Sequence, residues 1–119
     1  MANPFVHVEL HTQDTQKAKK FYTGLFDWTL EEVPDMNYTI IRVGEGTGGG
    51  MMKSPMPDAM PQWVPYVLVD DVAAFTEKAK SLGARALSDI TEVPDMGRFS
   101  MLVDPTGAAF ALWEPKMPA

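Results

Sequence analysis

The 119-residue sequence contains no cysteine, which excludes disulfides, thiolate metal sites and a cysteine nucleophile. It also has no apolar run approaching the roughly 20 residues that a membrane-spanning helix needs. Residues 1–4 lead into the first expected strand without the basic and apolar blocks of a signal peptide. These absences predict a cytoplasmic protein with no membrane partner.

Positive charge is sparse as well: 10 Lys and Arg stand against 16 Asp and Glu, a formal net charge of -6. The small lysine clusters at residues 17–20 and 77–80 are typical of solvated helix faces. Nucleic-acid binding requires a concentrated cationic surface, which the sequence does not provide. We therefore expect no nucleic-acid partner.

Most of the chain reads as two copies of one pattern. Residues 5–12 alternate as a strand, Asp14 is a good N-cap, and an apolar helical stripe follows. The stripe residues are Ala18, Phe21, Tyr22 and Leu25. Residues 63–85 repeat the strand and the helix, with Val72, Phe75, Ala79 and Leu82 expected to face inward. Gly83 is expected to stop the second helix.

The clearest sign of the repeat is a segment that occurs twice. Glu32-Val33-Pro34-Asp35-Met36 returns unchanged as Glu92-Val93-Pro94-Asp95-Met96. Each copy leads into a β-rich run, a glycine-containing turn and a last short strand. Further strands are expected at residues 28–33, 38–43, 84–90, 98–103 and 108–113.

The pattern predicts an α+β protein with two tandem βαβββ modules in a single domain. Module one covers about residues 4–52 and module two residues 63–114. Residues 53–62 contain three prolines and are interpreted as the linker. A helix would cover one face of each sheet, which leaves the other face able to form a lined cavity.

Four motifs in this order resemble the vicinal-oxygen-chelate superfamily, the group of glyoxalase I, bleomycin-resistance proteins and extradiol dioxygenases. They are Phe21-Tyr22-x-x-Leu25-Phe26-x-Trp28, Val69-Asp70-Asp71, Leu82-Gly83-Ala84 and Asp104-Pro105-Thr106-Gly107-Ala108. The resemblance covers nearly the whole chain. It implies a glyoxalase-like cupped mixed sheet with outer helices, a small-molecule or metal site in the cup, and a homodimer.

The metal site that this family uses takes one His or Glu from each of four strands. The resemblance places the four positions at His7, about Met51, Val64 and Ala111. Met, Val and Ala do not bind a hard or borderline divalent cation, so no metal or other cofactor is predicted. His7 and His11 would lie roughly 13 Å apart along one strand, too far to share an ion. A divalent metal held through His7 and a rearranged site is the minor alternative.

His7 and Glu9 are the candidate catalytic residues, because their strand face should point into the cup. They would act as an acid–base or ligand-binding pair. The alternative is a structural Glu9, hydrogen-bonded to Tyr66 or Arg98. His11, near the strand end, is expected to be partly exposed.

Five apolar or aromatic residues are candidates for a flat pocket that stacks on a planar ligand. They are Met51, Trp63, Tyr66, Phe99 and Trp113. Taken singly, each is more typical of ordinary core or dimer interface, and a subset of them is expected to line the cup. Gly44, Gly46 and Gly49 match G-x-G-x-x-G, but no helix can follow them, so a flexible hairpin or cavity rim is favoured over a phosphate loop.

Two functions remain open. The first is a metal-free protein that binds a small organic molecule in its cup, as the resemblance to bleomycin-resistance proteins implies. The second is an enzyme of the same superfamily, either a lyase or dioxygenase with a rearranged metal site or a metal-free catalyst that uses His7 and Glu9.

Overall fold

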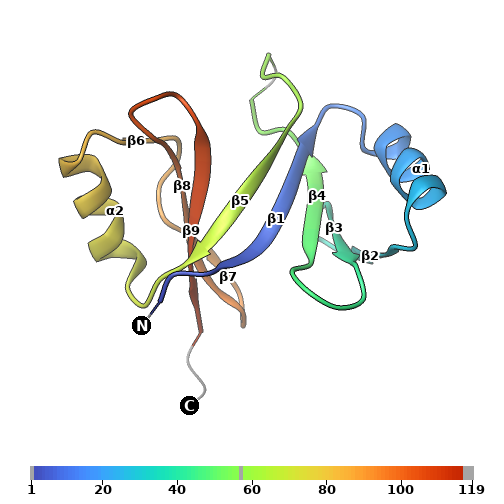
Figure 1. Cartoon of the computed structure of the whole chain (residues 1–119), viewed down its shortest axis with the longest axis horizontal. Coiled ribbons are helices and arrows are strands. Elements are labelled where there is room, and N and C mark those ends of the chain that lie inside the picture. The colour runs from blue at the N-terminus through green and yellow to red at the C-terminus, as the bar shows by residue number, and fades with distance from the viewer. Residues whose placement is uncertain (1, 57, 117–119) are drawn as a thin grey trace. The chain divides into compact units, whose positions relative to one another are not determined.

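The computed structural model describes residues 2–56 and 58–116. Pro57, in the predicted linker, lies outside the described residues. The chain divides into an N-terminal unit, residues 7–64, and a C-terminal unit made of residues 2–6 with residues 65 onward. Each unit contains one helix (Figure 1). None of the helices in the described ranges is long and apolar enough to cross a membrane.

The first repeat covers residues 5–53. Its elements are β1 (Phe5–Thr12), α1 (Thr15–Leu25), β2 (Thr29–Val33), β3 (Tyr38–Arg42) and β4 (Gly49–Lys53). The predicted cap of α1 is confirmed, because the carboxylate of Asp14 accepts a hydrogen bond from the backbone N–H of Lys17 at 3.0 Å.

The four strands of the first repeat lie in the order β2-β3-β4-β1. β1 and β4 are parallel, and the other two pairs are antiparallel. Leu10, Ile41 and Met51 form the buried core under α1, with Ala18 and Tyr22 packed against it. Helix α1 therefore covers one face of a mixed sheet.

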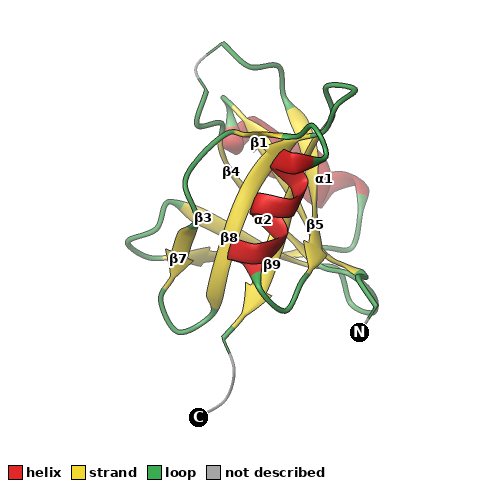
Figure 2. Cartoon of the chain, turned by 90° about the vertical axis from the view of Figure 1, so that its left-hand side faces the viewer, coloured by secondary structure: helices red, strands yellow, loops and turns green. Residues whose placement is uncertain are grey.

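The second repeat has the same order with one strand divided. Its elements are β5 (Gln62–Leu68), α2 (Val72–Ser81), β6 (Arg85–Ala86), β7 (Thr91–Val93), β8 (Gly97–Val103) and β9 (Ala109–Pro115). The strands lie in the order β5-β9-β8-β6, with β7 also paired to β8. Figure 2 shows α2 lying over β8 and β9, and the core there contains Val69, Val72, Leu102 and Leu112.

The α+β class and the two βαβββ modules are confirmed. In each module the first strand pairs in parallel with the last one. The repeated segment also folds alike in both copies: Val33 and Val93 end a strand, and Asp35 and Asp95 adopt positive φ angles of 71° and 67°. Identical local sequence thus forms the same turn in two different places.

The predicted strand at residues 84–90 is wrong in its length. Only Arg85 and Ala86 form β6, and pairing to β8 resumes with β7. Between them Leu87 still donates its N–H to the carbonyl of Met101 at 2.8 Å. Ser88 and Asp89 follow, residue types that favour turns over strands, so the pairing is interrupted there.

The expected inward stripes of the helices are only partly inward. Phe21 and Leu25 on α1 are 61% and 58% exposed. Leu82 is 71% exposed because it follows the last residue of α2 and forms its C-cap. Apolar spacing therefore located both helices but overstated how much of each stripe the sheet covers.

Candidate functional site

Three polar residues of β1 share the sheet face opposite α1. Leu10 of the same strand packs in the core under α1, and side chains alternate between the two faces of a strand. His7, Glu9 and His11 therefore point to the other face. Glu9 and His11 are both buried, so their polar atoms need hydrogen-bond partners inside the protein.

Glu9 is the centre of a hydrogen-bond network. Its side chain is buried, with the residue 4% exposed. His11 Nε2 lies 2.7 Å from Glu9 Oε1, and the hydroxyl of Tyr38 donates to Glu9 Oε2 at 2.6 Å. A carboxylate only accepts hydrogen bonds, so His11 carries its proton on Nε2 when Glu9 is ionised.

His7 joins the network through Tyr38. Its Nε2 atom lies 2.7 Å from the Tyr38 hydroxyl oxygen and 3.9 Å from Glu9 Oε2. Tyr38 has one hydroxyl proton and donates it to Glu9, so His7 donates its Nε2–H to the phenol oxygen. The network runs from His7 through Tyr38 to Glu9 and on to His11.

The ionisation of His7 is biased toward the neutral form. Burial lowers the pKa of His7, and the nearby carboxylate of Glu9 only partly opposes that effect. The His7 side chain is nevertheless 31% exposed, more than the buried Glu9 and His11. His7 is thus the member through which a ligand would reach the network, and it would meet that ligand as a neutral imidazole.

Tyr38 reaches Glu9 because Gly50 has no side chain. A Cβ atom at Gly50 would lie 1.7 Å from the Tyr38 hydroxyl oxygen, and Gly50 is the β4 residue that pairs with Glu9. The phenol therefore occupies the space that a side chain at Gly50 would fill. Local sequence patterns did not point to Tyr38 or Gly50 as site residues. The one sequence signal near Gly50 is the Gly-Gly-Gly run next to the Met-Met pair.

The expectation that His11 is partly exposed is wrong. His11 is buried and is held by Glu9 two residues before it in the strand. Arg98, suggested by the sequence as one partner of Glu9, donates through Nη2 to both carboxylate oxygens of Glu114, at 2.9 and 3.1 Å.

Three of the predicted ligand-binding residues lie together in the C-terminal unit. The rings of Tyr66 and Phe99 are 5.9 Å apart, and Phe99 is the cross-strand partner of Trp113. Tyr66 pairs with Ala111, which lies two residues before Trp113 on β9 and so on the same face. They form one aromatic face of the sheet.

The other two predicted residues lie in the N-terminal unit. Met51 is in the core under α1, on the opposite face of the sheet from Glu9. Trp63 is in an aromatic cluster with Tyr22 and Trp28. Met51 therefore does not share a sheet face with His7 and Glu9.

The donor set does not fit a divalent cation. Of the four positions implied by the resemblance, Val64, Met51 and Ala111 are buried residues without an oxygen, imidazole or thiolate donor. Within residues 2–56 and 58–116, no group of three or more His, Asp or Glu is arranged to hold a metal ion.

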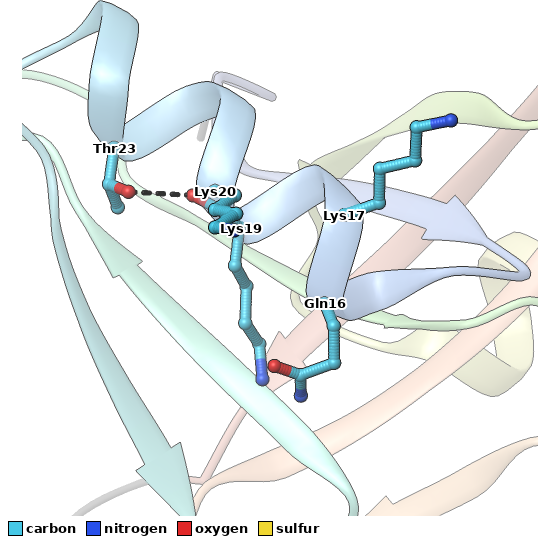
Figure 3. A pocket seen from close by; sticks show the side chains of 5 residues that line it. All are labelled: Gln16, Lys17, Lys19, Lys20 and Thr23. Carbon is cyan, nitrogen blue, oxygen red and sulfur yellow. Dashed lines mark hydrogen bonds between the residues drawn. The ribbon is translucent and has the colours of Figure 1, made fainter.

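The lysines of α1 form a surface depression with Gln16 and Thr23 (Figure 3). Thr23 donates its hydroxyl to the backbone carbonyl of Lys19, and Lys19 forms an ion pair with Glu32. Lys17 points away from these residues in Figure 3. This surface is a solvated helix face, as its composition indicated.

Comparison with solved structures defines the class of fold. Hypothetical protein BH1468 from Bacillus halodurans superposes with a TM-score of 0.69 at 14% identity, covering 100% of this chain and 99% of its own. Methylmalonyl-CoA epimerase from Mycobacterium tuberculosis gives 0.68 at 18% identity, covering 95% and 88%. At such identities the likeness shows the fold alone, which is glyoxalase-like.

The chain belongs to the Glyoxalase/Bleomycin resistance protein/Dioxygenase superfamily, whose pattern matches residues 5–112. "Putative glyoxylase CFP32" of Mycobacterium tuberculosis is 34% identical over 90% of this chain and 42% of its own length. "Anthracycline biosynthesis protein DnrV" of Streptomyces peucetius is 31% identical over 88% of this chain and 44% of its own. The chain thus spans less than half the length of these relatives.

Proposed function

We propose that this protein binds a small organic molecule on the sheet face that carries His7, Tyr38 and Glu9. The observation that carries the proposal is the continuous network of these side chains, buried at Glu9 and accessible at His7. A network whose members hold one another in place presents its polar atoms in fixed positions, which reduces the entropy lost on binding.

The chemistry of the network indicates the class of ligand. His7 is biased toward the neutral form by burial, which lowers its pKa, so it offers a hydrogen bond and not a positive charge. In a neutral His7 that donates Nε2–H to Tyr38, the other ring nitrogen, Nδ1, is an acceptor, so an uncharged molecule with a hydroxyl or N–H group suits such a contact. An anionic ligand would gain little from it.

The test is a binding screen followed by titration. A thermal-shift screen of planar, uncharged metabolites and antibiotics would find candidates, and calorimetry would give their Kd values. For a ligand at this site, His7→Ala and Tyr38→Phe should each weaken binding roughly tenfold or more, the loss expected for one good hydrogen bond. Lys20→Ala, on the exposed face of α1, is the control and should leave Kd unchanged. Equal affinity in all three variants would contradict the proposal.

The second candidate is an enzyme that transfers protons without a metal. It is favoured by the hydrogen-bond chain from His7 Nε2 through the Tyr38 hydroxyl to Glu9 Oε2, with distances of 2.7 and 2.6 Å. In such a chain a proton taken up at one end can be passed to the other. Glu9 would be the base and Tyr38 the group that links it to His7.

Deuterium exchange separates the two functions without knowledge of the product. Carbonyl compounds with an acidic C–H bond would be incubated with the protein in deuterated water and followed by proton NMR. An enzyme should remove the C–H signal of its substrate, and Glu9→Gln should abolish this exchange while the substrate still binds. A binding protein should leave every C–H signal intact.

The proposal also includes a cytoplasmic homodimer. The relatives are more than twice as long as this chain, so one of them has the length for two such domains in a single polypeptide. Two copies of this chain would reach the same size by association. Light scattering on the purified protein should give twice the mass of the 119-residue chain.

A further inference from the structure

A separate cavity of about 250 Å³ lies in the N-terminal unit, on the α1 side of the sheet. Val8 and Ile41 form its floor, and both are paired in register with Gly49. A Cβ atom at Gly49 would collide with the carbonyl oxygen of Val8 at 2.0 Å, so only glycine fits between these two residues. The strand at this point therefore adds no side chain to the floor.

Two indole rings form the walls of this cavity. Trp28 and Trp63 have their ring centroids 6.4 Å apart, with the ring planes at 81°. Tyr22 packs against both rings, with its centroid 5.6 Å from that of Trp28 and 5.4 Å from that of Trp63. The cavity is therefore bordered by a near right-angled corner of two indole rings, a geometry that suits the face and the edge of another ring.

The lining has almost no polar chemistry. Among the residues that the structure describes, the polar side-chain groups of the lining are the Thr47 hydroxyl and the two indole N–H groups, and no charged side chain lines the cavity. A charged ligand would lose its hydration without compensation there. The volume is also below the roughly 300 Å³ of the smallest drug-sized pockets, which limits the occupant to one or two rings.

We propose that this corner binds a small, uncharged aromatic molecule of one or two rings, placed between Trp28 and Trp63. The site is independent of the network around Glu9, which lies on the other face of the sheet. The nearby side chains of Phe21 and Phe26 are also exposed, so a second copy of the chain is the competing occupant of this surface.

Indole is a suitable probe, because it is flat, uncharged and of the required size. Titration with indole should shift the NMR signals of the Trp28 and Trp63 ring N–H groups in a saturable way. The Trp113 signal should not move, because Trp113 is not among the residues that line the cavity. For so few atoms the expected Kd is about 0.1–1 mM.

Two matched variants in one exposed loop test the location. Thr47→Phe places a phenyl group into the cavity from its rim, whereas Glu45→Phe places the same group in the same loop outside the lining. Thr47→Phe should raise the Kd for indole at least tenfold, and Glu45→Phe should leave it unchanged. Amide spectra of both variants would show that the fold is retained.

Three results would overturn the proposal. One is the absence of a saturable shift at Trp28 and Trp63 up to about 5 mM indole, well above the expected Kd. Another is an unchanged Kd in Thr47→Phe. The third is a shift of the two signals on dilution of the protein alone, which would show that a second copy covers the corner.

Discussion

The hydroxyl of Tyr38 connects two residues that are 29 and 31 positions away in the chain. It accepts a hydrogen bond from His7 and donates one to Glu9, so a single oxygen atom orients both side chains. Because Glu9 is buried, each donor that it loses leaves part of its charge unsolvated. The hydroxyl should therefore matter for stability as well as for binding.

Replacing Tyr38 by Phe should lower the free energy of unfolding by about 1–3 kcal/mol, the usual cost of an unsatisfied buried polar group. Urea denaturation followed by tryptophan fluorescence would measure the loss. Tyr22→Phe is the matched control, because Tyr22 lies in the aromatic cluster outside this network. If the two variants are equally stable, the Tyr38 bond to Glu9 contributes nothing.

A side chain at Gly50 should destabilise the fold. Gly50→Ala should cost about 1–3 kcal/mol, because the new methyl group would overlap the phenol of Tyr38 and force it to move. Gly24→Ala is the contrasting variant: Gly24 lies in α1, and a Cβ atom there would have no other atom within 4 Å. That variant should gain about 0.5–1 kcal/mol, because Ala favours the helix over Gly.

Thermal or urea unfolding of both glycine variants would show the opposite signs. In a protein that already carries Tyr38→Ala, the Gly50→Ala substitution should cost almost no stability, because the ring that it would overlap is gone. A Gly50→Ala protein with full stability in the presence of Tyr38 would mean that the phenol has another position of equal energy.

At the scale of elements, helix α2 is capped by two carboxylates from different parts of the chain. Asp71 accepts the N–H of Ala74 at 3.1 Å, as a local cap does. Glu114, at the end of β9, accepts the N–H of Val72 at 2.9 Å and is paired with Arg98. The bond to Glu114 attaches the start of the helix to the sheet that it covers.

The second cap predicts a pH dependence. The hydrogen bond from Val72, followed by that from Arg98, lowers the pKa of Glu114. A carboxylate with a lowered pKa stabilises the fold above its ordinary value, and this contribution is lost as the pH falls through the folded-state value. Stability from Glu114 should therefore be full at pH 7 and decline in the acid range below about 4.5.

Glu114→Ala should lower the free energy of unfolding at pH 7 by about 1–2 kcal/mol, the range measured for helix caps. The difference from the parent protein should shrink in urea melts carried out toward pH 3. Glu77→Ala, on the exposed side of α2, should change stability by less than about 0.5 kcal/mol. A deficit that is the same at every pH would rule out the charge of Glu114 as its cause.

At the scale of the whole molecule, membership of the family does not bring a metal site with it. Of the four positions that the resemblance implies, three hold Met51, Val64 and Ala111, and Met51 faces α1 instead of the sheet face that carries His7. Family and fold define an architecture, whereas function depends on the residues placed in it.

Elemental mass spectrometry on tag-free protein, with and without added zinc, nickel and iron, should give far less than one ion per chain, because a single imidazole is too weak a ligand set. His7→Ala should leave this background unchanged. Near-stoichiometric metal that disappears in His7→Ala would show a rebuilt site and would favour a metal-dependent lyase or dioxygenase.

The sequence predicted well the features that depend on neighbours in the chain. Strand β1 was expected at residues 5–12 and is found there, and the Asp14 cap and the Gly83 stop lie where the spacing placed them. The repeated Glu-Val-Pro-Asp-Met segment correctly indicated two related modules. The family resemblance, carried by short motifs in a fixed order, is also confirmed.

The tertiary structure decided what each of these residues contacts. It put the Tyr38 phenol over Gly50 and against Glu9, buried His11, and turned Met51 toward α1. None of this is encoded in local spacing, because it depends on the register in which strands far apart in the sequence pair. A shift of one residue in that register would send every side chain of a strand to the opposite face. The sequence by itself therefore determined the modules and the family, and only the pairing of their strands determined the site.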